Sequence, residues 1–164
     1  GSSLNITLIE VLLVSILTFL IANIGITPIK KVFLGDAGSM VLGFILSWLL
    51  IYYSHPTSRH IHPVLALWCV PIPIYDLLGV IIRRLIRKIN PFKSDRRHIH
   101  HILIDLGLKP KHVFLIIVFF SIIISITGGI VYFSFGPAPA LLCYFILFLV
   151  YIYISLALSR KIFL

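Results

Sequence analysis

Five long apolar runs are the feature that most constrains how this 164-residue chain can fold. They cover residues 4–25, 37–53, 63–82, 113–135 and 139–158. A helix crosses the ~30 Å hydrocarbon core of a bilayer with about 20 apolar residues, and each run meets or approaches that length. Strand spans would need segments of about ten residues that alternate in polarity, whereas these runs are continuously apolar. The sequence therefore predicts an all-α, polytopic integral membrane bundle of about five transmembrane helices.

Turn-forming residues separate the apolar runs and support this division. They are Thr27-Pro28, Ser54-His55-Pro56, Asn90-Pro91 and Gly136-Pro137. Inside the third run, Pro71 and Pro73 predict a kinked helix, because proline cannot donate a backbone hydrogen bond. Inside the second run, Gly38 and Gly43 would let a neighbouring helix approach closely.

The distribution of basic residues predicts the orientation. With the N-terminus outside and the C-terminus in the cytoplasm, all 14 Lys and Arg residues except Arg59 lie on the cytoplasmic side, as the positive-inside rule requires. We therefore expect one transmembrane domain over residues 1–164, with cytoplasmic loops at 26–36 and 83–112. Topology and anionic lipid headgroups account for the net charge of +9, so no nucleic acid partner is expected.

The segment KVFLGDAGS places Asp36 between two glycines where the second run begins. Glycine lets the backbone bend tightly and lets a ligand approach, and free N–H groups at a helix start can help to hold an anion. The structural alternative is that Asp36 caps the helix. The two interpretations are compatible.

The segment DRRHIHH, residues 95–101, concentrates cations and imidazoles in the second cytoplasmic loop. Its candidate residues are Arg96, Arg97, His98, His100 and His101. Arginine grips phosphate oxygens and histidine donates or shuttles protons near neutral pH, which favours phosphate or diphosphate recognition. A metal site and a plain solvated loop remain open. The two cysteines, Cys69 and Cys143, lie inside apolar runs and indicate neither a disulfide framework nor a zinc site.

Two polar residues lie close to the cytoplasmic ends of apolar runs. Asp76 precedes Arg83 by seven residues, so helical rise places it about 10 Å inside the end of the third span. An ionisable group at that depth is a functional candidate, with a structural hydrogen bond or ion pair as the equal alternative. Asn23, near the end of the first run, is favoured as a helix cap.

In chain order, the segments KVFLGDAGS, HPVLALWCVPIPIYDLLGVIIRR and NPFKSDRRHIHH resemble the polyprenyl-phosphate N-acetylhexosamine-1-phosphate transferases of glycosyltransferase family 4, and most closely their bacterial undecaprenyl-phosphate members. The resemblance covers essentially this whole chain but only the C-terminal half of a family enzyme. It implies an enzyme of the inner (plasma) membrane that moves sugar-1-phosphate from a UDP-N-acetylhexosamine to polyprenyl phosphate. The reaction would release UMP, use Mg²⁺ or Mn²⁺ and initiate envelope glycan synthesis.

The resemblance also implies roles for individual residues. Asp36 looks like the catalytic metal ligand, and Phe33 matches an aromatic residue that contacts uracil. The loop residues would engage the nucleotide-sugar diphosphate: His98, His100 and His101 as catalytic groups, with Arg96 and Arg97 as binding groups. Asp76 and Asn23 match recurrent polar positions of the substrate site.

The sequence also departs from the family pattern. The aspartate-rich motif and the NxxDGxDGL-like loop, which supply most carboxylates of the family's site, do not appear in it. One aspartate is a poor Mg²⁺ site by itself. We therefore expect this polypeptide alone to be inactive unless a missing N-terminal half, a partner chain or a homodimer completes it.

The alternative to a transferase is a noncatalytic lipid-phosphate-binding subunit, or a transporter with a cytoplasmic anion-binding loop. A transporter is expected to carry polar or broken helices at mid-membrane in several spans. Most of the candidate groups here gather on one predicted side of the membrane, which favours a site at the membrane surface.

Overall fold

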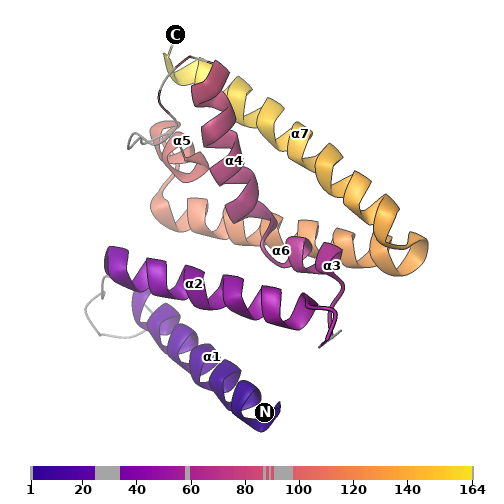
Figure 1. The fold of residues 1–164 in the computed structure, drawn as a ribbon. Coiled ribbons are helices and arrows are strands. Elements are labelled where there is room, and N and C mark those ends of the chain that lie inside the picture. Colours follow the sequence, from indigo (N-terminus) through magenta and orange to yellow (C-terminus); the bar gives the residue numbers. More distant parts are fainter. Residues whose placement is uncertain are drawn as a thin grey trace. The chain divides into compact units, whose positions relative to one another are not determined.

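The computed structural model describes residues 2–24, 34–57, 60–86, 88, 90 and 98–163. The regular elements of these residues are all helices: α1 (Ser2–Ile24), α2 (Gly35–Ser54), α3 (Pro63–Cys69), α4 (Pro71–Ile86), α5 (Ile99–Asp105), α6 (Pro110–Phe135) and α7 (Pro137–Phe163) (Figure 1). The predicted all-α class is confirmed. The chain divides into two compact units, Gly1–Ser47 and Trp48–Leu164, which are described separately below.

The apolar helices are those of a multi-pass membrane protein. Within the described residues, α2, α6 and the Pro137–Ser159 part of α7 are each long and apolar enough to cross a bilayer. A fourth span results if α3 and α4 are counted as one bent span. In α1, Ile9–Asn23 forms a shorter apolar helix. The described helices thus give three or four full-length spans, where the sequence predicted about five.

The third apolar run is broken, as its prolines predicted. Helices α3 and α4 meet at an angle of 83°. Between them, Val70 leaves the helical region with φ −134° and ψ 47°, and its N–H donates to the Leu67 carbonyl. Pro71 then opens α4, where its fixed φ suits a first helical residue and its missing N–H removes no helical bond.

Aromatic side chains form the core of the second unit. Trp68, Tyr75 and Tyr144 are almost fully buried, and the Tyr75 hydroxyl donates to the Tyr144 carbonyl at 2.8 Å. The Trp68 indole lies directly on Gly128 of α6, where an added Cβ would be only 1.9 Å from the indole Cδ2. Gly128 therefore allows α3 and α6 to pack closely.

The glycines expected to allow close approach were different ones. Within the described residues, no atom lies within 4 Å of a Cβ added at Gly43, and one added at Gly38 would meet only the Leu34 side chain. The expectation that Gly38 and Gly43 let a neighbouring helix approach closely therefore stays a prediction. Glycine spacing marks a possible contact face, but it does not specify which helix, if any, packs there.

A single glycine joins the two longest helices. Gly136 has φ 89°, a left-handed conformation that glycine adopts without steric cost, and its N–H donates to the Tyr132 carbonyl. Pro137 begins α7 directly afterwards. Helices α6 and α7 diverge from this corner, and α4 and α5 contact both of them (Figure 1).

Candidate functional site

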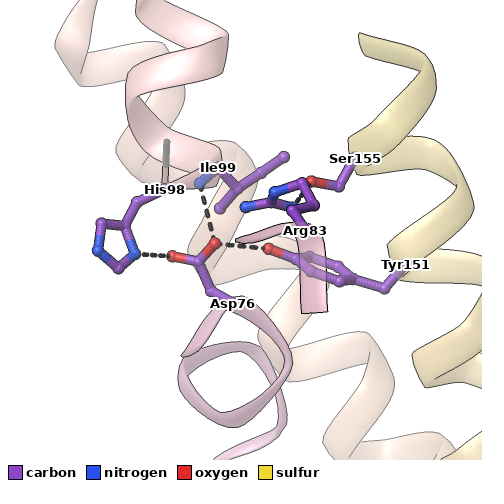
Figure 2. A network of polar contacts seen from close by, with 6 residues as sticks. All are labelled: Asp76, Arg83, His98, Ile99, Tyr151 and Ser155. Atoms are coloured by element: carbon purple, nitrogen blue, oxygen red, sulfur yellow. Dashed lines mark hydrogen bonds and ion pairs between the residues drawn. The ribbon is translucent and has the colours of Figure 1, made fainter. Parts of the chain in front are cut away.

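The carboxylate of Asp76 lies at the centre of a polar network in the second unit (Figure 2). Its Oδ2 accepts a hydrogen bond from His98 Nδ1 at 2.8 Å. Its Oδ1 accepts from the Ile99 N–H at 3.0 Å and from the Tyr151 hydroxyl at 2.9 Å. The Asp76 side chain is only 13% exposed. One carboxylate on α4 thus connects the start of α5 with α7.

The contact with Ile99 follows from how helices begin. The first N–H groups of a helix have no carbonyl partner within that helix, and a preceding side chain usually accepts from one of them. His98 occupies the cap position of α5 but makes no such side-chain bond. Asp76 instead supplies the acceptor from a different helix, so the position of α5 depends on α4.

Three imidazoles lie next to one another at the start of α5. The rings of His98 and His100 are stacked with centroids 5.8 Å apart, and those of His100 and His101 are 4.1 Å apart. Burial lowers the pKa of His100 below its ordinary value of 6.5, and His101 and His98 lower it further, while Asp76 opposes the shift. His100 is therefore neutral near pH 7 and offers one donor and one acceptor.

Two arginines expected in the cytoplasmic segment 83–112 are instead buried in α4, which continues to Ile86. Arg83 and Arg84 are 3% and 6% exposed. The Arg83 guanidinium donates to the Ser155 hydroxyl on α7 (Figure 2). The α4–α7 interface therefore holds positive as well as negative charge, and burial of such groups requires polar partners.

Asp36 lies in the first unit, within the first turn of α2, and is exposed. The residue before it, Gly35, has φ 69°, so the expected tight backbone bend is confirmed. The capping alternative is not confirmed, because Asp36 lies inside the helix rather than before it. Within the described part of the chain, its carboxylate has no hydrogen-bond or ion-pair partner.

The remaining predicted site residues are less informative. Asn23, also in the first unit, donates from Nδ2 to the Phe19 carbonyl of its own helix at 2.9 Å. Phe33, Arg96 and Arg97 lie outside the described residues. The structure thus brings together Asp76, His98, His100 and His101, and it describes Asp36 and Asn23 within a different unit.

The metal alternative for the histidines finds no support in the geometry. Over the described ranges, no group of three or more His, Cys, Asp or Glu side chains is arranged to hold a metal ion. Cys69 and Cys143 are both free thiols.

A cavity of about 420 Å³ lies beside this network, between α4, α5, α6 and α7. It shares two lining residues with the network, Ile99 and Tyr151. Its other walls are apolar apart from the Thr127 hydroxyl. Because a nucleotide diphosphate requires several charged or hydrogen-bonding partners, this cavity is not its binding site.

Sequence reasoning missed Tyr151, Ser155 and the Ile99 backbone as members of the network. One signal was present: Tyr151, Ser155 and Ser159 recur every four residues along an otherwise apolar helix. Residues with that spacing share one helix face. Ser155 and Ser159 are in fact buried, at 0% and 4% exposure.

Comparison with known proteins finds one family model and several named relatives. The family model of glycosyl transferase family 4 matches residues 2–54. A relative from Haemophilus influenzae is 39% identical over 146 residues, which cover 87% of this chain and 41% of the relative. Relatives from Pasteurella multocida and Yersinia pestis are 38% and 34% identical and cover 74% and 87% of this chain, and 35% and 40% of their own lengths.

All three relatives are named undecaprenyl-phosphate alpha-N-acetylglucosaminyl 1-phosphate transferase. The chain is similar to glycosyl transferase family 4 over residues 2–54 and to these relatives over most of its length, which confirms the resemblance seen in its motifs. It spans about two fifths of the length of the relatives it matches. No solved structure matches it.

Proposed function

We propose that this chain is part of a membrane enzyme that transfers N-acetylhexosamine-1-phosphate from a UDP-sugar to undecaprenyl phosphate and releases UMP. The observation that carries this proposal is the 39% identity, over 87% of the chain, to a relative named for such a transfer. The matched region is long enough to include candidate polar residues of both units. The histidine cluster is of the kind that a diphosphate substrate requires.

The reaction is a displacement at phosphorus. An oxygen of the lipid phosphate attacks the sugar-bearing phosphorus of the UDP-sugar, and the bond from that phosphorus to the bridging oxygen breaks. UMP leaves with the bridging oxygen and its negative charge. His98, His100 and His101 would donate hydrogen bonds to the diphosphate, with Arg96 and Arg97 adding positive charge, because preorganised donors stabilise charge that develops in the transition state.

Asp36 is the proposed ligand of a divalent cation, Mg²⁺ or Mn²⁺. Its carboxylate is exposed and has no partner among the described residues, which fits this role. Mg²⁺ in phosphate-transfer sites takes one or two carboxylates and completes its shell with water and substrate phosphates. When bound, the cation would neutralise diphosphate charge. Further carboxylates would come from a part of the enzyme that this sequence does not contain.

We further propose that the protein resides in the inner membrane with α5 on the cytoplasmic side. The biased distribution of Lys and Arg supports this orientation. In a variant lacking Cys69 and Cys143, cysteine at the exposed Lys109 should react with an impermeant reagent only from the cytoplasmic side. Cysteine at the exposed Thr57 should react only from outside. The reverse pattern would overturn the orientation.

The proposed transfer reaction is tested by combining the chain with the region of a relative that the chain does not match. The chain is expressed in membranes alone and together with the unmatched three fifths or so of the Haemophilus influenzae relative. We expect release of UMP from UDP-N-acetylglucosamine, with formation of a lipid-linked sugar diphosphate, only when both parts are present. Uptake of the sugar nucleotide into vesicles without UMP release would favour the transporter alternative and contradict the transferase.

A further inference from the structure

We propose that Asp76 is a positioning residue: it fixes the tautomer and the direction of His98, so that His98 presents its Nε2 to the nucleotide-sugar diphosphate. This inference rests on the proposed transferase function. The family resemblance implied that Asp76 is a substrate-binding residue, with a structural hydrogen bond or ion pair as the equal alternative. The geometry points to a residue that acts through the histidine instead.

The first step is the tautomer. An ionised carboxylate can only accept hydrogen bonds, so the 2.8 Å contact between Asp76 Oδ2 and His98 Nδ1 requires the proton on Nδ1. Nε2 is then the nitrogen of neutral His98 that carries the lone pair. A proton taken up there would give an imidazolium that keeps its Nδ1–H on Asp76 and donates from Nε2–H to a diphosphate oxygen. In metal and catalytic sites, a partner of this kind sets which imidazole nitrogen faces the ligand.

The second step is the direction of the ring. The side chain of His98 is 39% exposed, while that of Asp76 is 13% exposed. The edge of the imidazole that carries Nδ1 faces the network, and the ring extends away from the carboxylate (Figure 2). Nε2 therefore lies on the edge of the ring that is turned away from the carboxylate, in a side chain that is more exposed than that of Asp76.

The third step is that the carboxylate is itself held in place. Oδ1 accepts from both the Ile99 N–H and the Tyr151 hydroxyl, which come from different elements. These two bonds fix the carboxylate plane, so Oδ2 has a defined direction toward His98. Ile99 follows His98 in the chain. The Asp76 side chain therefore positions both the His98 imidazole and the backbone that bears it.

Direct contact between Asp76 and the diphosphate is disfavoured for two reasons. Both carboxylate oxygens already have donors, and the side chain is mostly buried. A carboxylate would also repel the phosphate oxygens, since like charges at close range cost free energy unless a cation lies between them. His98, stacked on His100, can transmit the effect of Asp76 to the rest of the histidine cluster.

The test begins with Asp76→Asn, which keeps the size and one oxygen acceptor of the side chain. Its amide group can donate to Nδ1 of His98, so we expect the Nε2–H tautomer to appear in ¹⁵N NMR spectra of histidine-labelled chain in lipid nanodiscs. The wild-type protein should show the Nδ1–H tautomer. Hydrogen exchange at Ile99 should remain slow in both proteins if the amide oxygen still accepts from that N–H. An unchanged tautomer in Asp76→Asn would overturn the proposal.

The control for this variant is Ser155→Ala. Ser155 lies four residues after Tyr151 on the same helix and is fully buried, but its hydroxyl accepts from Arg83 and does not contact Asp76. The substitution perturbs the same α4–α7 interface without touching the carboxylate. We expect the wild-type tautomer of His98 in this variant. A tautomer change there would mean that general loosening of the interface, and not the carboxylate, controls His98.

Kinetics are measured as UMP release by the chain expressed together with the unmatched part of the Haemophilus influenzae relative, called the two-part preparation below. Loss of a supporting partner of a site residue typically costs about 10- to 100-fold. In Asp76→Asn no carboxylate stabilises the imidazolium form of His98, so kcat should fall by that factor, and KM for the UDP-sugar should change by less than about threefold. A normal kcat despite a switched tautomer would overturn the positioning role. Absence of UMP release from the wild-type preparation, with the tautomer switch intact, would overturn the transferase assignment alone.

Discussion

Asp36 and Asp76 are the same residue type in contrasting surroundings. Asp36 is exposed in the first turn of α2, and no described residue binds its carboxylate. Asp76 is largely buried and accepts three hydrogen bonds from α5 and α7. Burying a carboxylate without partners would cost several kcal/mol of folding free energy. A buried carboxylate is therefore expected to accept hydrogen bonds from protein donors. An exposed carboxylate keeps its capacity to bind something from outside the chain.

The two units differ in the same way in their packing. On α2, the surroundings of Gly43 are open, whereas on α6 the Trp68 indole fills the space over Gly128. The second unit is therefore the part in which positions are fixed by contacts within this chain. The first unit carries a ligand-binding candidate, Asp36, whose carboxylate has no partner among the described residues.

The largest effect that this contrast predicts is on turnover by Asp36→Asn. In the two-part preparation, loss of the carboxylate charge should reduce UMP release by at least about 100-fold, the typical effect of removing one charge-stabilising group from an active site. The matched control is Asp105→Asn, which removes an exposed carboxylate from α5 and should leave turnover within about twofold. Near-normal turnover in Asp36→Asn would remove the reason for placing a cation there.

The next effect concerns stability and compares two glycines in membrane-spanning helices. Gly128→Ala should destabilise the protein by about 1–3 kcal/mol, because the new methyl group overlaps the Trp68 ring and the core must shift. Gly43→Ala meets nothing within 4 Å and should be neutral or stabilising by up to about 1 kcal/mol through helix propensity. Thermal unfolding of the chain in nanodiscs would measure both. Equal effects would contradict the packing difference between the units.

Much of the fold was predictable because it depends on local composition. The apolar runs predicted the helices, and Pro71 predicted the break before α4. The GDAGS motif identified Asp36 and the bend at Gly35. These features depend on residues that are adjacent in sequence.

The network around Asp76 could not be predicted in the same way. Asp76 contacts His98 across 22 residues of sequence and Tyr151 across 75, so both pairings depend on how α4, α5 and α7 pack together. The contact of Trp68 with Gly128 is similarly remote. The depth of Asp76 in an apolar run showed that it needs a partner, but that observation does not identify the partner.

The smallest predicted effect is on the titration of His100. Because burial and neighbouring imidazoles lower its pKa, its NMR titration midpoint should lie below 6.5, and His101→Gln should raise it. The groups that face His100 are His101, His98 and Asp76. A midpoint at or above 6.5 would show that the second unit is more open than its structure indicates.

The lowered pKa of His100 also predicts the direction in which stability changes with pH. The unfolded chain binds a proton at His100 more readily than the folded chain does, so the stability contributed by neutral His100 is present above pH 6.5 and decreases as pH falls below it. His100→Gln should therefore reduce the loss of stability on acidification. Unfolding measured in nanodiscs between about pH 8 and pH 5.5 would reveal the difference.

The one-residue connection at Gly136 determines that the start of α6 and the end of α7 lie on the same side of the membrane. Two consecutive crossings by α6 and α7 return the chain to the compartment it left, so α5 and the end of α7 at Phe163 must face the same water phase whichever way the protein is inserted. A reporter fused after α7 would thus reveal the compartment from which a soluble ligand reaches His98. The location of this reporter would not depend on how many times the helices before α6 cross the membrane.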